Sequence, residues 1–416
     1  MTNSRFSVTI VGAGIVGIAT AALLAEAGHS VTVIDRSGIA EETSKGNAAA
    51  FAFSDIMPLA SPKIMTKAPK WLLDPLGPLS IRPSYLPRLA PWLWQFWKAS
   101  LPSRFEASIS AQSALMRLAE TEMMALVGRA GIETMVRHDG SLELYESEAE
   151  LKAAEAGWQR RADAGIAFEH VRGDRLAELQ PGLSRQFVAG TFVPGWKTVS
   201  DPHAFALAIW AYAERLGAVF TRDEVVAIET GGGGPSVRLG SRASHTSDRL
   251  IVCAGAWSTR LLNPLTRLQI PLETERGYNT TLPPATFPLN RQLIFGNHGF
   301  VITPLETGIR VGGAVELAGL DLAPNYARSK TMLEKAARFL PGLKTGGGTE
   351  WMGFRPSMPD SLPVIGSLPE NSSILVGFGN GHLGLTQSAA MGRLLANLVD
   401  GQTPAIDIAA LRPDRF

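Results

Sequence analysis

Three glycines and one aspartate near the start of the chain are spaced for binding the phosphates of a nucleotide. Gly12, Gly14 and Gly17 form a Gly-x-Gly-x-x-Gly motif between a short apolar run and a helical pattern, and Asp35 closes the next apolar run. The first glycine permits a tight turn, the second lets the backbone approach a pyrophosphate, and the third lets the helix pack on the strand. The helix N-terminus offers N–H groups to the phosphates, and Asp35 can accept ribose hydroxyl hydrogens. The motif predicts a dinucleotide site without separating NAD from FAD.

The elements that must hold this turn form a βαβ unit: a strand over 8–11, a helix over 15–27 and a strand over 31–35. Similar strand-and-helix patterns return near 200–260 and 350–400, while 268–315 alternates like antiparallel strands. We predict an α/β fold with a Rossmann-like nucleotide domain built from discontinuous segments, plus an inserted α+β substrate domain with an antiparallel sheet. The expected boundaries are 1–60, 195–265 and 345–416 for the nucleotide domain, and 61–194 and 266–344 for the substrate domain.

Two local predictions concern the inserted segments. Residues 55–105 are rich in proline and tryptophan and match neither a sheet nor a long helix. Residues 134–138 and 141–145 are two strand-like runs separated by Asp139-Gly140, which predicts a β-hairpin.

Composition narrows the class of protein. The 416 residues are 45% hydrophobic and 19% charged, with a net charge of +1, so no overall positive field favours binding to nucleic acid. The single cysteine, Cys253, permits no intramolecular disulfide and no cysteine metal cluster, which favours a reduced, cytoplasmic protein and predicts no metal site. The uncharged stretch 6–25 contains the three motif glycines and leads into a second strand, so we interpret it as core and predict no transmembrane segment.

Further segments complete a larger pattern. They are 43–48 (TSKGNA), 225–228 (VVAI), 252–258 (VCAGAWS), 353–360 (GFRPSMPD) and 379–384 (GNGHLG). Together with the glycine turn they resemble the D-amino acid oxidase-like flavoprotein family, and within it the bacterial D-amino acid dehydrogenases. The resemblance runs from about Val8 to the end of the chain.

The resemblance implies non-covalent FAD and oxidation of the α-carbon of a D-amino acid by hydride transfer to flavin N5. Cys253 lies in a buried-looking strand, so we assign it to core packing and expect no covalent link to the flavin. The expected FAD contacts are Gly12, Gly14, Ile15, Val16, Gly17, Asp35, Arg36, Ser44, Asn47, Ala48, Val225, Ala254, Gly255, Trp257, Gly353, Gly379, Asn380, Gly381, His382, Leu383, Gly384 and Leu385.

Four residues are candidates for catalysis. Arg355 is the first choice for gripping the substrate carboxylate, because a guanidinium matches a carboxylate in a planar, bidentate way. Tyr278 could hydrogen-bond the carboxylate or amine, and Arg276 could contact flavin or substrate, although a tyrosine on a strand is more often core. His382, in the glycine-rich turn before the last helix, either bonds the flavin or packs beside it.

Several alternatives stay open. The substrate could be a proline-like or secondary amino acid, of the hydroxyproline, sarcosine or glycine type. The chain could instead be an NAD-dependent dehydrogenase or the flavin subunit of a larger complex. The electrons could pass to oxygen, a quinone or another part of a respiratory chain, and the tryptophans within 92–97 could dock the enzyme on the inner membrane.

Overall fold

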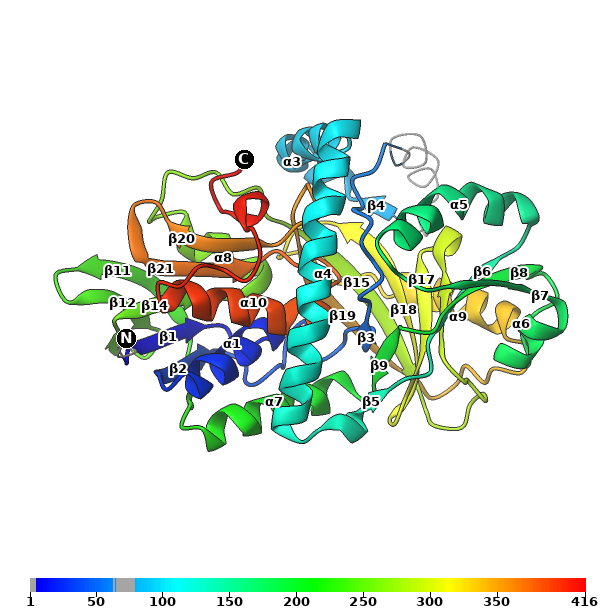
Figure 1. Ribbon diagram of the computed structural model, residues 1–416, viewed down its shortest axis with the longest axis horizontal. Helices are drawn as coiled ribbons and strands as arrows, with labels where there is room; N and C mark the ends of the chain where they lie inside the picture. The colour runs from blue at the N-terminus through cyan, green and yellow to red at the C-terminus, as the bar shows by residue number, and fades with distance from the viewer. Residues whose placement is uncertain (1–4, 63, 65–78) are drawn as a thin grey trace.

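The computed structural model describes residues 5–62, 64 and 79–416 and places them around two sheets (Figure 1). Part of the expected proline- and tryptophan-rich segment, including Pro69, Trp71, Pro75 and Pro78, lies outside these residues.

The first sheet contains the glycine turn and has the strand order β10-β2-β1-β14-β21-β20, with all neighbours parallel except β20 and β21. Its strands are β1 (Ser7–Val11), β2 (Ser30–Asp35), β10 (Val219–Arg222), β14 (Arg249–Val252), β20 (Val364–Leu368) and β21 (Asn371–Phe378). The central strands are mainly apolar and buried because both faces of the sheet are covered. The three-stranded meander of β11 (Val225–Gly231), β12 (Gly234–Leu239) and β13 (Ser244–Thr246), with α8 (Ser258–Leu262), packs on one face.

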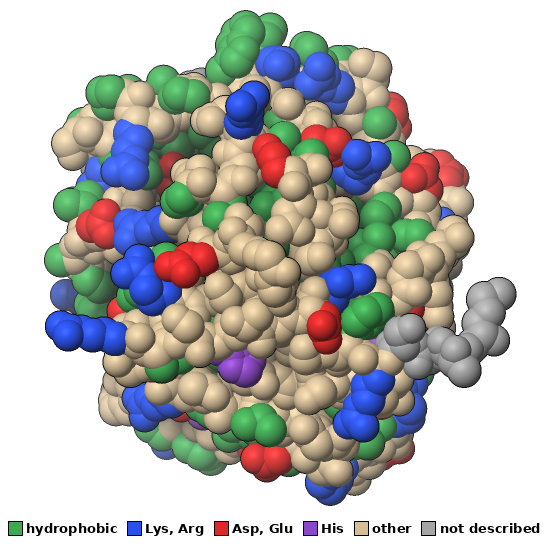
Figure 2. All heavy atoms as spheres, turned by 90° about the vertical axis from the view of Figure 1, so that its left-hand side faces the viewer, with side chains coloured by type: hydrophobic (Ala, Val, Ile, Leu, Met, Phe, Trp, Pro, Cys, Tyr) green, Lys and Arg blue, Asp and Glu red, His purple; other side chains and the backbone are tan. Residues whose placement is uncertain are grey.

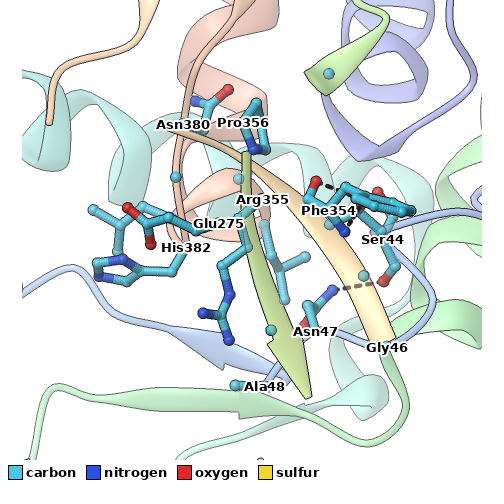
Figure 3. Close-up of a pocket in the computed structure, with 18 of the residues that line it drawn as sticks. Ser44, Gly46, Asn47, Ala48, Glu275, Phe354, Arg355, Pro356, Asn380 and His382 are labelled. Atoms are coloured by element: carbon cyan, nitrogen blue, oxygen red, sulfur yellow. Dashed lines mark hydrogen bonds between the residues drawn. The ribbon is translucent and has the colours of Figure 1, made fainter. Parts of the chain in front are cut away.

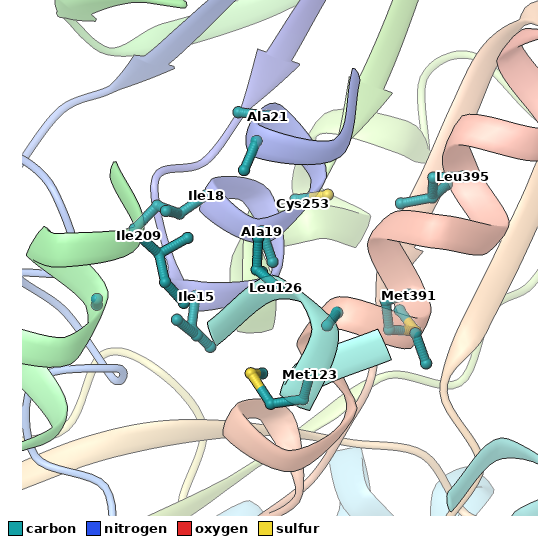
Figure 4. Packing of buried hydrophobic residues seen from close by; sticks show 14 of the residues in the cluster. Ile15, Ile18, Ala19, Ala21, Met123, Leu126, Ile209, Cys253, Met391 and Leu395 are labelled. Carbon is teal, nitrogen blue, oxygen red and sulfur yellow. The ribbon is translucent and has the colours of Figure 1, made fainter. Parts of the chain in front are cut away.

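Helices cover the other face of this sheet. They are α1 (Ile15–Glu26), α4 (Pro102–Ala130), α7 (Pro202–Arg215) and α10 (Gly384–Val399). Helix α1 is apolar on every side because it lies between the sheet and the other helices; Ile18 and Ala19 on α1 pack among Met123 of α4 and Met391 of α10 (Figure 4).

The second sheet is mixed and has the order β19-β15-β18-β17-β16-β6-β8-β7, with β4 paired to β18. Its strands are β4 (Leu79–Ile81), β6 (Ser141–Tyr145), β7 (Glu169–Arg172), β8 (Ala189–Val193), β15 (Glu273–Leu282), β16 (Gln292–Phe295), β17 (Phe300–Leu305), β18 (Gly308–Leu317) and β19 (Thr349–Ser357). Helices α6 (Gly173–Leu179) and α9 (Ala327–Phe339) pack on one face. The opposite face of this sheet looks toward the nucleotide half.

The α/β class and the discontinuous nucleotide sheet are confirmed, but the elements do not divide at the expected boundaries. Strand β19 belongs to the second sheet, so the segment 345–416 contributes to both halves. Helix α4 lies within 61–194, yet it packs on α1 and α10, standing between the two sheets in Figure 1.

Two local predictions are wrong. The run 134–138 does not pair with 141–145: β5 (Val136–Arg137) pairs with β9 (Lys197–Val199), which also pairs with β3 (Ala50–Phe51), whereas β6 pairs with β8 and β16. Within 55–105 a 14-residue helix, α3 (Leu86–Ala99), forms despite Pro91. Pro87, the second residue of the helix, fits a first helical turn, where no N–H partner is required.

On the face at the nucleotide end, acidic side chains lie among the basic ones (Figure 2), in keeping with the near-zero net charge. Within the described ranges, no helix combines the length and apolar character needed to cross a membrane. Helix α5 (Glu148–Asp163) covers part of the open face of the second sheet beside Tyr145.

Candidate functional site

A cavity of about 1050 Å³ lies between the two halves and is lined by residues from both. The glycine turn, the loop 41–48 and the start of α10 form one side, and β15, β18 and β19 of the second sheet form the other. This volume is at the upper end of small-molecule sites and suits a large cofactor together with a substrate.

The glycine turn has the close packing that the motif predicts. Gly12 has a φ of +109°, and a Cβ there would lie 2.4 Å from the carbonyl oxygen of Cys253. A Cβ at Gly17 would lie 2.0 Å from the carbonyl oxygen of Gly12. The N-cap residue of helix α1, Gly14, supplies no side-chain cap, and the first turn contains no acidic residue; the N-terminus lines the cavity, where it suits an anion.

Asp35 lines the cavity at the end of β2 and also fixes the turn. Its Oδ2 accepts the N–H of Ala13 at 2.9 Å, and its Oδ1 accepts the N–H of Ser37 at 2.8 Å. The neighbouring Arg36 lies over the Trp257 ring, 4.6 Å from its centre. The carboxylate thus has a structural task beside the ribose contact that the sequence predicts.

The loop after β2 wraps around the helix start. Ser44 Oγ accepts the N–H of Ile15 at 2.9 Å, and Asn47 donates to the Ser44 carbonyl and accepts from Ala49. The carbonyl of Asn47 accepts from the buried Arg310 at 2.6 Å, and burial lowers the pKa of Arg310 to about 10. Arg310 is a site residue that the sequence reasoning missed.

The turn before α10 forms the opposite end of the cofactor side. Gly379 has a φ of +88°, and a Cβ there would lie 2.7 Å from Cγ of Met358. Asn380 donates to Gln387 inside the helix, and α10, like α1, begins with no side-chain cap and no acidic residue. The N-termini of α1 and α10 therefore face the same cavity, and neither has a cap from the side chain of its own N-cap residue.

Arg355 projects from β19 into the cavity, as Figure 3 shows. Its Nη1 donates to the Ala314 carbonyl at 2.9 Å, and Nη2 lies 3.5 Å from the Gly313 carbonyl oxygen. Gly277 on β15 leaves space for it, since a Cβ there would lie 2.3 Å from Nη2. Burial lowers the pKa of Arg355 and the charge of Glu275 opposes that shift, which keeps a cation available to hold a carboxylate.

Arg276 and Tyr278 are not brought to the substrate in the expected way. The Tyr278 hydroxyl donates to Glu316 and accepts the N–H of Asn325, so its hydrogen-bonding capacity is used. The Arg276 guanidinium, fully buried, donates to the carbonyls of residues 319, 322 and 323. Both side chains make their contacts on the α9 side of β15, although Tyr278 is also among the residues that line the cavity, and the roles expected for them stay predictions.

The other face of β15 carries residues that the sequence reasoning missed. Glu275 and Asn279 line the cavity; Glu275 accepts from the Ser357 hydroxyl at 2.5 Å, and Asn279 donates to the Gly46 carbonyl at 2.8 Å. Alternation along the strand separates residues 275, 277 and 279 from 276 and 278. That rule identifies two faces, but nothing local shows which one looks into the cavity.

His382 lies at the rim of the cavity, with its side chain 39% exposed and its Nε2 3.2 Å from Oδ2 of Asp55. Arg161 on α5 lies 3.6 Å from the same carboxylate. Burial pushes the pKa of Asp55 upward, but the hydrogen bond with His382 and the charge of Arg161 hold it below its usual range. His382 thus has a protein partner and is placed beside the cavity.

The residues present fit FAD. The glycine cradle and the start of α1 suit a pyrophosphate, and Asp35, Arg36, Val225 and Trp257 line the end where an adenosine would lie. The uncapped start of α10 suits the negative charge that a reduced flavin carries. Cys253 is buried, which raises its pKa to about 12, so it is a poor nucleophile for a covalent attachment.

Comparison with known proteins agrees with this geometry. A family model described as FAD dependent oxidoreductase (DAO) matches residues 7–398. A D-amino-acid oxidase of Bradyrhizobium diazoefficiens is 33% identical over 422 aligned residues, covering 98% of each chain. A D-amino acid dehydrogenase of Allorhizobium ampelinum is 32% identical over 421, again covering 98% of each.

Solved structures show the same fold at lower identity. Glycine oxidase from Geobacillus kaustophilus matches with a TM-score of 0.76 at 21% identity, over 99% of both chains. L-proline dehydrogenase from P. horikoshii matches with a TM-score of 0.75 at 19% identity, over 99% of this chain and 98% of that one. At these identities the likeness concerns the fold alone.

Proposed function

This chain belongs to the DAO family of FAD-dependent oxidoreductases, and from that premise we propose that it oxidises the α-carbon of a D-amino acid. The relatives with the highest identities above are a D-amino-acid oxidase and a D-amino acid dehydrogenase, each aligned over nearly the whole chain. Their names support D-amino acids as the substrate class.

The observation that carries the proposal is the guanidinium of Arg355 inside the cavity. Two of its N–H groups are directed to carbonyls of β18, which fixes the plane of the head group, and the others remain for a ligand. A planar, fixed fork holds a carboxylate in one orientation, and so determines where the adjoining α-carbon lies.

The reaction removes a hydride from the α-carbon and a proton from the amine. FAD, when bound, supplies the two-electron acceptor. Arg355 holds the carboxylate throughout, while the sheet and the loop 43–48 exclude water from the reacting carbon. Water then hydrolyses the released imine to a 2-oxo acid and ammonia. We assign to His382, which is paired with Asp55 at the rim, the orientation of the entering amine.

The test is an anaerobic screen of the holoenzyme with paired D- and L-amino acids, together with glycine, sarcosine and proline. Loss of the flavin's visible absorbance marks a substrate. We expect bleaching by D-enantiomers and formation of the matching 2-oxo acid and ammonia. Bleaching by L-enantiomers or secondary amines alone would contradict the stereochemical assignment, and no bleaching by any of them would contradict amino acid oxidation.

We further propose a quinone as the electron acceptor, reached at a membrane surface. Support comes from α3, where the side chains of Trp94 and Trp97 stack at 4.7 Å and remain 58% and 38% exposed. Exposed tryptophans favour the membrane interface. Sedimentation with anionic liposomes checks this: the native enzyme should co-sediment and a Trp94→Ser/Trp97→Ser variant should not. Absence of binding, with faster reoxidation by oxygen than by quinone analogues, would exclude it.

A further inference from the structure

A second charged region lies in the same cavity, beyond Arg355. Glu143 stands in the middle of β6, on the strand face that looks toward α5 and the cavity. It is flanked on the opposite face by Leu142 and Leu144, which belong to the core under α9. Burial raises the pKa of Glu143, while Arg161 and a hydrogen bond with Tyr145 act in the other direction. A carboxylate in this position pays a desolvation cost that a cation could offset.

The nearby charges leave Glu143 without a close ion pair. The charge of Arg161 favours the ionised form of Glu143 and that of Asp55 opposes it, yet the Arg161 head group lies 3.6 Å from Asp55, donates to the Ser54 carbonyl at 3.1 Å and stacks on Trp158. Asp55 also has His382 as a partner. Among the residues that the structure describes, Glu143 forms no ion pair within 4.0 Å, so this part of the cavity wall presents a carboxyl group with no cation in direct contact.

The pairing of the strands relates Glu143 to Arg355. The Arg355 head group is bound over Gly313 and Ala314 on β18, and Gly313 is paired with Phe300 on β17. Phe300 is paired in turn with Phe295 on β16, the residue before Gly296.

The Glu143 carboxylate reaches the same position along the strands as the paired residues Gly313, Phe300 and Phe295. A Cβ placed on Gly296 would lie 3.2 Å from Oε1 of Glu143. The two head groups therefore stand at one level across the sheet, over β18 and β16. Two strand spacings separate them, or about 10 Å.

Three glycines form part of the surface between the two head groups. Gly313, Gly299 and Gly296 come from β18 and from the two ends of the β16–β17 turn, and all three line the cavity, as do Ile294 and Val301 of β16 and β17. An extended chain can therefore lie over the glycines between Arg355 and Glu143, with the side chains of Ile294 and Val301 beside it.

We infer that Glu143 selects the substrate's side chain, and that the preferred substrates are amino acids ending in an ammonium or guanidinium group, of the ornithine, lysine and arginine type. The α-carboxylate lies on Arg355 and the distal cation on Glu143. This inference rests on the proposed amino acid oxidation, and it adds the class of side chain. Opposite charges at the two ends of one glycine-lined strip also disfavour acidic side chains, which would meet Glu143.

The test compares the native holoenzyme with Glu143→Gln, which keeps the shape of the side chain and removes the charge. Glu146→Gln is the matched control, because Glu146 follows β6 and pairs with His298 at 2.9 Å but does not line the cavity. We expect Glu143→Gln to lower kcat/KM for lysine, ornithine and arginine by about 30-fold or more, mainly through KM. The value for norleucine, which has no distal cation, should stay unchanged in both variants.

A binding experiment separates this inference from the proposed function. ε-Aminocaproate and caproate differ only in the distal ammonium, and neither has an α-amine to oxidise. The native protein should bind ε-aminocaproate more tightly, measured by the change in flavin absorbance, and Glu143→Gln should lose that difference. If no amino acid is oxidised while this difference persists, the reaction is wrong and the cation subsite stands. Equal affinities in the native protein, or an equal loss for lysine and norleucine in Glu143→Gln, would overturn the subsite.

Discussion

The two walls of the cavity place their polar groups in different ways. On the nucleotide side the groups are mainly backbone N–H groups and glycines, contributed by short turns such as 12–17 and 379–384. On the substrate side they are charged side chains, Arg355, Glu275 and Glu143, from strands far apart in the chain. Backbone recognition depends on local conformation, whereas side-chain recognition depends on which strands become neighbours. The first is therefore visible in a sequence motif, whereas of the second only Arg355 lies in a motif, and Glu275 and Glu143 are recognised as neighbours only in the folded sheet.

The largest expected effect comes from the substrate wall. Arg355→Leu removes a charge-assisted, bidentate contact and leaves the substrate carboxylate unpaired. We expect a loss of about 3–5 kcal/mol in transition-state stabilisation, or roughly two to four decades in kcat/KM, with an unchanged flavin spectrum. Steady-state kinetics and absorbance spectra measure both.

Arg355→Lys is the companion variant and should recover only part of the activity, because a point charge does not reproduce the planar fork. Amino acid amides should be poor substrates for the native enzyme and no worse for Arg355→Leu. Near-native oxidation of D-amino acids by Arg355→Leu would show that Arg355 on the substrate side does not bind the substrate carboxylate.

On the nucleotide side, a substitution that disturbs the backbone of the glycine turn should lower stability and FAD binding. Gly12→Ala combines a φ of +109° with a Cβ 2.4 Å from the Cys253 carbonyl oxygen, so we expect about 2–5 kcal/mol of lost stability and loss of bound FAD. Gly28→Ala is the matched control: its φ is +89° but no atom lies within 4 Å of the new Cβ, so only strain of about 1–2 kcal/mol should appear. Denaturant unfolding and flavin content distinguish the two, and equal effects would remove the close-packing argument.

Asp35 is a residue of the nucleotide side whose side chain we expect to bind FAD. Asp35→Ala should weaken FAD binding, since ribose hydrogen bonds to a charged acceptor are worth about 1.5–3 kcal/mol each. Because Asp35 also accepts from Ala13 and Ser37, the apoprotein should unfold more easily as well. Calorimetric titration of apoprotein with FAD measures the affinity; an unchanged value would show that the adenosine end lies elsewhere.

Tyr278 should affect stability and leave the chemistry unchanged. Tyr278→Phe leaves Glu316 and the Asn325 N–H each without one partner, which should cost about 1–3 kcal/mol of unfolding free energy. The exposed Tyr326, whose ring meets the Tyr278 ring edge-on, provides the control variant Tyr326→Phe. A fall in kcat/KM for Tyr278→Phe at equal stability would restore the substrate contact that the sequence suggested.

The smallest effect concerns the rim. The pKa of Asp55 is depressed in the folded protein, so its carboxylate contributes stability above its unfolded pKa of about 3.9 and loses it as pH falls through the lower folded value. Asp55→Asn should be less stable than the native protein at neutral pH, by under about 1 kcal/mol. The difference should vanish in strong acid; a difference that persists there would mean that packing, not charge, holds this residue.

The same contrast explains what could be predicted from the sequence. The βαβ start, the last helix and Arg355 follow from motifs whose parts lie close together in the chain. The motifs do not show which face of β15 lines the cavity, because alternation distinguishes Glu275 from Arg276 without showing which of the two faces it. Glu143 has no local signal at all, since its neighbours across the sheet come from 189–193 and 292–295. The expected hairpin at Asp139-Gly140 fails for the same reason: pairing with distant strands outweighs the local turn preference.

The strand order of the nucleotide sheet also has a consequence during synthesis. Strand β1 ends at Val11, and β14, which pairs with one of its edges, begins only at Arg249. At about 5–20 residues per second, a ribosome leaves that edge unpaired for roughly 10–50 s. Through this interval the apolar β1 and α1 can associate with other nascent chains, so the yield of folded protein should depend on how well chaperones shield the first segment of the chain.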